Sequence, residues 1–199
     1  MTDVVGPDEA IALLRQGLVV AVPTDTVYGL AAALEHPEAV ATLFRLKRRP
    51  TSVALPVLVG ERHAISSLGV EWPERAVRLS DEFWPGALTI VVAVDARLAS
   101  SVGGSGSIGF RLPREEVLLR ILHECGPLAV SSANEHGEPP CQSVEQVLKT
   151  LGANEFLAAV LDGGVCNGEV STVVEIAPDS WRILRAGAIS SEEIERALA

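Results

Sequence analysis

Residues 18–30 read LVVAVPTDTVYGL, an apolar run that gives way to a polar segment at Pro23. Leu18 to Val22 has the length and apolar character of a buried strand, and Pro23 ends it because proline cannot donate to a strand ladder. Residues 24–28 then place two hydroxyls, a carboxylate and a phenol directly after that strand. Ligands of open α/β sheets usually bind beyond strand ends. The stretch therefore predicts an α/β fold with a polar ligand site, although threonine and aspartate are also common in caps and turns.

The rest of the chain alternates strand-like and helix-like stretches. We expect further strands over Leu55–Val59, Leu88–Val94, Ser107–Leu112, Leu128–Ser131, Leu157–Leu161, Thr172–Ile176 and Trp181–Leu184. We expect helices over His36–Arg45, Pro73–Phe83, Arg114–Glu124, Ser143–Leu151 and Ser190–Leu198. Because the two kinds of element do not alternate strictly, a mixed sheet is favoured over a parallel one. No linker is long enough to separate two cores, so residues 1–199 are predicted to form a single α/β domain.

The composition is that of an ordinary globular protein. The 199 residues are 48% hydrophobic and 21% charged, which excludes disorder and collagen-like structure. No uncharged apolar run approaches the ~18 residues of a membrane-spanning helix, and the acidic start MTDVVGPDEA carries no secretory signal, so we expect no membrane association. Cys125, Cys141 and Cys166 match no metal pattern, and an odd number does not suit a disulfide framework. We therefore expect reduced thiols in a cytoplasmic protein.

The formal net charge of −10 argues against a protein whose main task is to grip nucleic-acid phosphates. Any contact with RNA must therefore rest on a local basic patch. Lys47-Arg48-Arg49-Pro50 forms one such patch after a predicted helix, where basic residues can also merely complement the helix dipole. Lys47 is one of only two lysines against fourteen arginines, however. An ammonium beside a guanidinium fork suits a polyphosphate.

Two further sets of polar residues occupy strand ends. Ser131-Ser132-Ala133-Asn134 follows a predicted strand and can hydrogen-bond a nucleotide or an amino acid, or simply form a turn. The second set is dispersed along the chain and consists of Ser107, Arg111, Ser171, Thr172 and Arg185. Arginines that end apolar strands need a partner, because an isolated buried charge would cost several kcal/mol. An anionic ligand or an acidic side chain can supply that partner.

Several well-known catalytic patterns are missing. Gly103-Gly104-Ser105-Gly106 is not a P-loop, because no GKS or GKT follows it. GxSxG and HExxH do not occur, and the histidines at 36, 63, 123 and 136 have no ligand spacing. Hydrolase triads and zinc chemistry are therefore disfavoured.

Seven motifs follow one another along the chain: PTDTVYGL, KRRP, WPGALT, IGFRLP, SSANEHGEPP, STVVE and ILRAGAI. Together, over residues 17–189, they resemble the YrdC-like family, and most closely its short single-domain threonylcarbamoyl-AMP synthases. The resemblance implies a twisted mixed β-sheet flanked by helices, with a concave cleft. It implies an enzyme that joins L-threonine, bicarbonate and ATP into threonylcarbamoyl-AMP and releases pyrophosphate, with Mg²⁺ accompanying ATP. It also implies tRNA-modifying partner proteins that take up the product.

The resemblance also implies roles for individual residues. The ATP-binding positions fall on Lys47, Arg49, Ser107, Ser132, Asn134 and Arg185. The threonine-binding positions fall on Thr26, Arg111, Ser132 and Ser171. Lys47 and Arg49 are expected to be catalytic, because negative charge builds on the phosphoryl oxygens and on the leaving pyrophosphate. The chain departs from the family after Pro50, where it reads TSVALPVLV; many members continue with Asn-Pro and then a histidine, so any contact made by those residues must be made differently here.

Three alternatives remain open. One is an RNA-binding module of the same fold without synthase activity, using a cleft lined by Lys47, Arg48, Arg49 and Arg111; weak tRNA binding fits such a local patch. Another is a carbamoyl-adenylate-forming domain of the hydrogenase-maturation type, which normally sits inside a much longer chain. The third is a paralogue that has lost the activity, and the presence of the Lys47, Arg49, Ser132 and Asn134 side chains argues against it.

Overall fold

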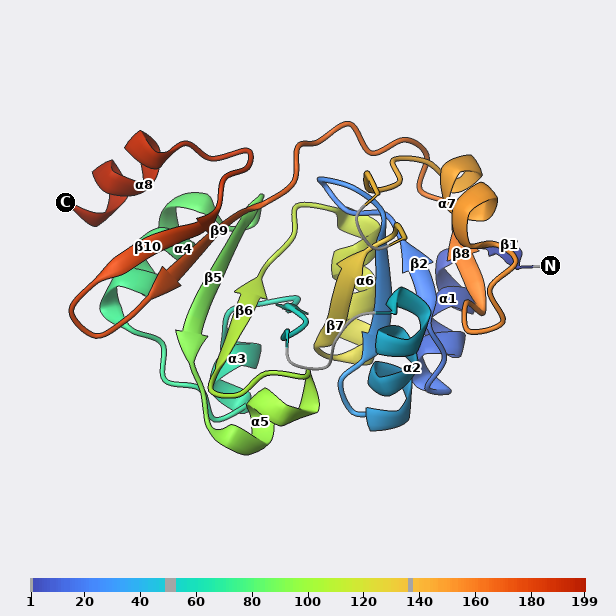
Figure 1. Cartoon of the computed structure of the whole chain (residues 1–199), viewed down its shortest axis with the longest axis horizontal. Coiled ribbons are helices and arrows are strands. Elements are labelled where there is room, and N and C mark those ends of the chain that lie inside the picture. Colours follow the sequence, from blue (N-terminus) through green and yellow to red (C-terminus); the bar gives the residue numbers. More distant parts are fainter. Residues whose placement is uncertain (1, 49–52, 136–137) are drawn as a thin grey trace.

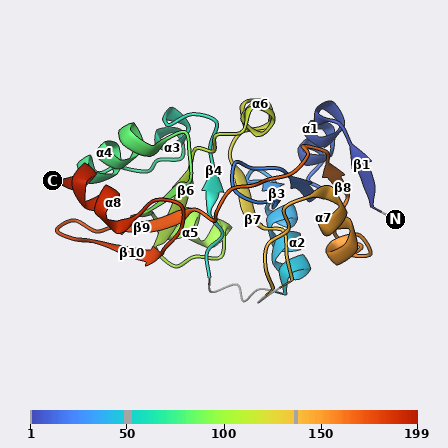
Figure 2. The ribbon, with the colours of Figure 1, turned by 90° about the horizontal axis from the view of Figure 1, so that it is seen from above.

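The computed structural model describes residues 2–48, 53–135 and 138–199. Within these ranges the strands form one ten-stranded mixed sheet in the order β1-β8-β2-β3-β7-β4-β6-β5-β9-β10 (Figure 1; β3 and β4 are labelled in Figure 2). The strands are β1 Asp3–Val5, β2 Val20–Val22, β3 Gly29–Ala33, β4 Val57–Leu58, β5 Leu88–Ala93, β6 Ser107–Arg111, β7 Leu128–Ser132, β8 Ala159–Leu161, β9 Thr172–Ile176 and β10 Trp181–Arg185. The helices are α1 Pro7–Arg15, α2 Pro37–Lys47, α3 His63–Ser67, α4 Glu74–Phe83, α5 Ala96–Ser101, α6 Glu116–Cys125, α7 Val144–Leu151 and α8 Ser191–Leu198. None of these helices of the described ranges has both the length and the apolar character that spanning a bilayer requires.

The predicted α/β class and mixed sheet are confirmed, and every predicted strand and helix is present with small shifts at its ends. The sequence prediction lacks β1, α1, β3, α3 and α5. β3 escapes it because Gly-Leu-Ala-Ala-Ala contains no β-branched residue and is buried along its whole length, so no polar alternation marks it. Close packing explains why residue 29 of β3 is glycine: a Cβ there would lie 2.7 Å from Cγ1 of Val130 on the neighbouring β7.

The sheet carries an apolar core on each face. Successive residues of β2 point to opposite faces, so Val20 and Val22 enter one core whereas Ala21 enters the other. α1 and α6 cover the first face, with Leu14 and Ile121 fully buried. α2 and α7 lie on the opposite side of the sheet (Figure 2), and their core continues to α3, α4 and α8.

The chain passes back and forth between two halves of the sheet. β1, β2 and β3 lie in one half, and β4, β5 and β6 lie in the other. β7 and β8 return to the first half, and β9 and β10 to the second. The halves meet where β7 pairs with β4, a strand of only two residues. Residues 162–171 then cross from β8 to β9 above this junction (Figure 1). Strand ends from both halves therefore lie close to the β7–β4 junction.

Two C-terminal features follow their sequence signals directly. Ser190 caps α8: its hydroxyl accepts from the N–H of Glu193, whose carboxylate accepts from the N–H of Ser190. A turn at residues 177–180, which contains Pro178, joins β9 to β10, and the N–H of Ala177 donates to Ser180 O at 2.9 Å. The antiparallel β9–β10 pair forms the edge of the sheet that carries Arg185.

Candidate functional site

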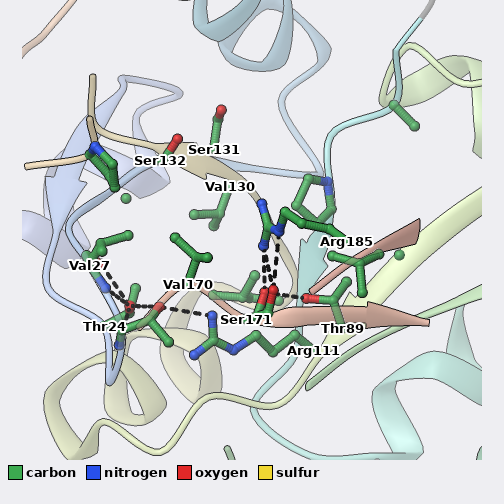
Figure 3. A pocket seen from close by; sticks show the side chains of 18 of the residues that line it. Thr24, Val27, Thr89, Arg111, Val130, Ser131, Ser132, Val170, Ser171 and Arg185 are labelled. Carbon is green, nitrogen blue, oxygen red and sulfur yellow. Dashed lines mark hydrogen bonds between the residues drawn. The ribbon is translucent and has the colours of Figure 1, made fainter. Parts of the chain in front are cut away.

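A cleft of about 640 Å³ lies at the junction of the two halves. Its walls come from residues 24–29 after β2, residues 53–58 around β4, the strands β5, β6 and β7, and residues 170–173. The polar side chains that line it belong to Thr24, Thr26, Tyr28, Thr89, Ser107, Arg111, Ser131, Ser132, Ser171 and Arg185. Figure 3 shows Val27, Val130 and Val170 among these polar groups. The cleft thus combines an apolar lining with a few convergent polar groups, as small-molecule sites do.

Arg111 ends β6 and is held by three acceptors. Its Nε donates to Gly86 O at 3.0 Å, its Nη1 to Thr26 Oγ1 at 3.1 Å and its Nη2 to Asp25 Oδ1 at 2.7 Å. The Arg111 and Asp25 side chains are only 7% and 14% exposed, so they form a buried ion pair. Burial lowers the pKa of Arg111, and the Asp25 carboxylate opposes that shift. The guanidinium has five N–H donors, and three of them are used by described residues, so two remain for a ligand within that part of the chain.

The hydroxyl of Thr26 is oriented by its neighbours as an acceptor. Thr24 Oγ1 donates its only proton to Val27 O at 2.7 Å. The 2.9 Å contact between the Thr24 and Thr26 hydroxyls must therefore be donated by Thr26. Since Thr26 Oγ1 also accepts from Arg111, what it can still offer a ligand is a lone pair. A ligand group that faces Thr26 should be a donor, such as an amine or a hydroxyl.

Ser171 connects two strands and an arginine. Arg185 donates to Ser171 O from Nε at 3.1 Å and from Nη2 at 2.8 Å, and to Ser171 Oγ from Nη2 at 2.9 Å (Figure 3). Ser171 Oγ lies 2.9 Å from Thr89 Oγ1 on β5, and both residues are 5% exposed. Nη1 of Arg185 makes no hydrogen bond within the described ranges, so one edge of this guanidinium is available to a ligand.

The charge of Arg185 is not neutralised by a carboxylate among the described residues, in contrast to that of Arg111. Burial lowers the pKa of Arg185, and the positive charge of Arg111 lowers it further. The two guanidinium groups therefore share one part of the cleft and carry one excess positive charge between them. An anionic ligand would be stabilised there.

Lys47 ends α2 and reaches the opposite wall. It is only 5% exposed, and Nζ donates to Ser132 O at 2.9 Å, to Asn134 O at 2.6 Å and to Asn134 Oδ1. Asn134 Oδ1 also accepts from the Ser132 hydroxyl at 2.7 Å. A buried ammonium is thus held against the turn that follows β7, which gives this wall a positive charge with short polar side chains around it.

Residues 162–170 pack closely against the loop that carries Thr26. A Cβ on Gly168 would lie 2.2 Å from Asp25 O and 2.7 Å from Thr26 Cα, so only glycine permits this approach. The Tyr28 hydroxyl donates to Gly164 O at 2.9 Å and accepts from the N–H of Gly163 at 3.2 Å. Desolvation raises the pKa of Tyr28, which keeps the phenol neutral in this role. The crossing segment therefore fixes one wall of the cleft.

The structure brings most of the predicted site residues together. Those that line the cleft are Thr26, Ser107, Arg111, Ser132, Ser171 and Arg185. Lys47 and Asn134 join the same wall through Ser132. Arg49 lies outside the described residues, as do His136 and Gly137 of the SSANEHGEPP motif. The expected acidic partner is present for Arg111, which pairs with Asp25. Arg185 has no carboxylate partner among the described residues and donates to Ser171 instead.

Two functional candidates were missing from the predicted set. Asp25 belongs to the PTDTVYGL motif, but its role as the ion-pair partner of Arg111 is visible only in the structure. Thr89 stands in WPGALT, and its hydroxyl looks like ordinary strand composition until the fold sets it beside Ser171. A signal for Thr89 did exist in Gly109, since glycine inside a strand often marks a close approach: a Cβ there would lie 2.8 Å from Thr89 Cγ2.

The departure from the family pattern after Pro50 forms an apolar part of the cleft. Val53, Ala54, Pro56 and Leu58 all line it, whereas Thr51 and Ser52 lie outside the described residues. Leu184 lines the cleft as well, and Val53 and Leu184 are about half exposed at 49% and 48%. Here the chain offers apolar surface rather than amide or imidazole groups.

Comparison with known proteins places this geometry among relatives. The family model Sua5_yciO_yrdC, described as Telomere recombination, matches residues 12–187. A Mycobacterium tuberculosis (strain H37Rv) protein that provisionally carries the name threonylcarbamoyl-AMP synthase is 38% identical over 191 residues, which are 95% of this chain and 87% of that protein. The threonylcarbamoyl-AMP synthase of Bacillus subtilis (strain 168) is 37% identical over 94% of this chain and 55% of its own length.

Solved structures agree with the sequence comparison. The crystal structure of Pyrococcus abyssi Sua5 complexed with L-threonine has a TM-score of 0.88 and 33% identity, over 96% of this chain and 57% of that chain. This chain thus spans somewhat more than half of that longer protein. Escherichia coli YciO has a TM-score of 0.81 at 20% identity, over 94% of this chain and 92% of that chain, which shows the shared fold.

Proposed function

Because the chain belongs to the Sua5/YciO/YrdC family, we propose that it is a threonylcarbamoyl-AMP synthase, the name carried by its relatives in Bacillus subtilis and Pyrococcus abyssi. Such an enzyme is a nucleotidyltransferase that makes threonylcarbamoyl-AMP and pyrophosphate from L-threonine, bicarbonate and ATP. The observation that carries the proposal is one cleft with two differently equipped walls. Arg111, Thr26 and Ser171 suit an amino acid, and the wall with Lys47 suits a phosphate chain. Arg185 lies beside Ser171 and would serve both ligands.

The wall that carries Arg111, Thr26 and Ser171, which we call the threonine wall, favours one orientation of the bound amino acid. Its carboxylate would lie near Arg111 and Arg185, which carry the excess positive charge and still have N–H donors. A donor group of the substrate, its amine or hydroxyl, would face the lone pair of Thr26. Apolar side chains at Val27, Val130 and Val170 stand beside these groups and can contact the threonine methyl (Figure 3).

The nucleotide wall is assigned to the remaining residues of the predicted set. Lys47, Ser132 and Asn134 would bind phosphate oxygens after exchanging part of their present hydrogen bonds. Arg49 is proposed to act beside Lys47, and Ser107 to contact the nucleotide from β6. The apolar residues around Val53 offer surface to the base or ribose.

The reaction needs two bond-forming steps. The threonine amine adds to the carbon of bicarbonate, water leaves, and a carbamate forms. A carbamate oxygen then attacks the α-phosphorus of ATP, and the bond to the bridging oxygen breaks to release pyrophosphate. Negative charge grows on the phosphoryl and leaving oxygens in the second step, where Lys47, Arg49 and Arg185 would stabilise it. Catalysis would then rest mainly on positioning and electrostatics, because no covalent nucleophile is required.

We propose that Mg²⁺ accompanies ATP and that partner proteins receive the product. Mg²⁺ would enter with the ATP phosphates, since no cluster of three or more metal-binding side chains exists in the described ranges. The product would pass to tRNA-modifying partner proteins in the cytoplasm. With a net charge of −10, direct contact with tRNA would be weak and confined to the basic end of α2.

The deciding experiment is pyrophosphate release from ATP by the purified protein, with L-threonine and bicarbonate each present or omitted. Release that needs both substrates supports the synthase. Identification of threonylcarbamoyl-AMP by mass spectrometry would confirm the product. Absence of release by a folded protein, together with salt-sensitive tRNA binding, would instead favour an RNA-binding module of the same fold.

A further inference from the structure

Thr89 is held in a single orientation by its surroundings. It lies on β5, is 5% exposed, and contacts both Gly109 on β6 and Ser171, the residue that precedes β9. Its Cγ2 methyl occupies the space that a side chain on Gly109 would fill, because a Cβ built there comes within 2.8 Å of it. A β-branched residue has few χ1 choices. With the methyl seated on Gly109, the hydroxyl of Thr89 is directed at Ser171, 2.9 Å away.

Ser171 in turn orients Arg185. Both Nε and Nη2 of Arg185 donate to the Ser171 carbonyl, and Nη2 also donates to the Ser171 hydroxyl. In the observed rotamer of Ser171, Oγ contacts both Arg185 Nη2 and Thr89 Oγ1 (Figure 3). A Ser171 side chain released from Thr89 could rotate, and Arg185 would lose that contact. Nη1, the edge of the guanidinium left for a ligand, would then be less well fixed.

The hydroxyl groups of Thr89 and Ser171 carry two protons, and their mutual hydrogen bond uses one of them. Ser171 Oγ accepts from Arg185, and one hydroxyl of the Thr89–Ser171 pair donates to the other. The Thr89 hydroxyl has no other hydrogen-bond partner in the described part of the chain, and both residues line the cleft. Whichever hydroxyl donates within the pair, the other keeps one proton for a ligand. The pair therefore presents one directed donor beside Arg185.

We propose that Thr89 is a positioning residue of the synthase, which acts through Ser171 to hold the guanidinium of Arg185 in its working orientation. This inference rests on the proposed function and adds to it a residue outside the set that the sequence assigned. The Thr89–Ser171–Arg185 chain of hydrogen bonds also links the two substrates, because Ser171 is expected to bind threonine and Arg185 is expected to bind ATP. Loss of the Thr89 hydroxyl should therefore affect both threonine binding and turnover.

The test compares Thr89→Val, which keeps the shape and removes the hydroxyl, with Thr89→Ser, which keeps the hydroxyl and removes the methyl. We expect Thr89→Val to lower kcat/KM for threonine by about tenfold, through a higher KM and a lower kcat, with the melting temperature little changed. Thr89→Ser should recover most of the activity. Thr42→Val, the same substitution on the exposed side of α2, should match the wild type.

A double-mutant cycle separates positioning from a merely structural role. If Thr89 acts through Ser171, then Thr89→Val should cost little more in a protein that already carries Ser171→Ala. An equal additional loss in that background would overturn the proposal, and so would a Thr89→Val protein as active as the wild type. Failure of the wild type itself to release pyrophosphate would count against the synthase and not against Thr89.

A second readout needs no substrate. The Nε–H of Arg185 is bonded to the Ser171 carbonyl and gives its own nuclear magnetic resonance signal. We expect this signal to shift and to exchange faster with solvent in Thr89→Val, and to stay near its wild-type position in Thr89→Ser. An unchanged signal in Thr89→Val would show that Arg185 does not depend on Thr89.

Discussion

Asp25 Oδ1 accepts a hydrogen bond from Arg111 Nη2 at 2.7 Å across 86 residues of sequence, and both side chains are buried. Arg111 spends its other occupied donors on Gly86 O and on Thr26. The pair thus holds the loop after β2 against the end of β6 and neutralises one of the two arginines of the cleft. Asp25 neutralises Arg111, which leaves Arg185 as the excess positive charge of this part of the cleft.

Removal of Asp25 should be costly because it leaves a buried charge without its partner. We expect Asp25→Ala to lower the free energy of unfolding by about 3–5 kcal/mol. Asp8→Ala is the control, since its ion pair with Arg120 is exposed and should contribute less than about 1 kcal/mol. Denaturant unfolding of both variants measures the difference. Equal losses in the two proteins would show that the Asp25–Arg111 pair has no special weight.

Lys47 should matter for the rate of adenylate formation. We expect Lys47→Ala to reduce the rate of pyrophosphate release at least tenfold, about 1.4 kcal/mol of transition-state stabilisation. Its ammonium donates to the backbone of the Ser132–Asn134 turn, where phosphate oxygens are proposed to bind. Steady-state kinetics at varied ATP concentration measures the effect. Near-normal turnover would remove Lys47 from the catalytic set.

Arg185 should not be replaceable by lysine. Its Nε and Nη2 grip one carbonyl together, a geometry that a lysine ammonium cannot reproduce. We expect Arg185→Lys to lose activity almost as severely as Arg185→Ala, at least tenfold in kcat/KM, although it keeps the positive charge. The comparison is made by pyrophosphate release at varied threonine. Recovery of activity in Arg185→Lys would mean that charge alone suffices.

Gly168 should tolerate no side chain. A Cβ there would lie 2.2 Å from a backbone oxygen of Asp25, so Gly168→Ala must push residues 162–170 away from the Thr26 loop. We expect a several-fold higher KM for threonine and a lower melting temperature. Gly106→Ala is the matched control, because a Cβ at Gly106 meets nothing within 4 Å. An equally active Gly168→Ala protein would show that the segment does not shape the threonine site.

Stability should fall at alkaline pH. Desolvation raises the pKa values of the free thiols of Cys125, Cys141 and Cys166, so the folded protein keeps their protons after the unfolded chain has lost them. Their contribution is complete below the unfolded thiol pKa of about 8.5 and is lost as the pH rises above it. Tyr28, with its raised pKa, acts in the same direction at higher pH.

The measurement for this pH dependence is denaturant unfolding under reducing conditions at about pH 7.5 and about pH 9.5. The variant with alanine at all three cysteine positions should have a clearly smaller difference between the two pH values. A wild-type stability that stays level or increases over this interval would contradict the assignment of the raised pKa values.

The sequence predicted the strand and polar loop at residues 18–28 correctly because both signals are local. Pro23 ends the strand, and the polar residues follow at once. β3 was missed because Gly-Leu-Ala-Ala-Ala is buried on both faces and small in every side chain. Its place in the sheet depends on close packing against β7, which local propensity does not encode.

The candidate site also has features that the sequence predicts and features that only the tertiary structure shows. Residue types and motif order pointed to Arg111, Ser171 and Lys47, but not to what they contact. Ser171 and Thr89 are 82 residues apart, and Lys47 and Asn134 are 87 apart, so both contacts are products of the fold. The sequence could supply the chemistry of the cleft, whereas the hydrogen-bond direction at Thr26 and the excess charge at Arg185 needed the tertiary arrangement.

The path of the chain between the two halves of the sheet makes them inseparable in folding. Because β7 and β8 lie in the first half, after β4–β6 and before β9 and β10 in the second, no single backbone cut yields two fragments that each contain one complete half. A fragment that ends before β9 would also leave β5 as an unprotected sheet edge. We therefore expect one cooperative unfolding transition, with both halves losing their amide protection together in hydrogen exchange.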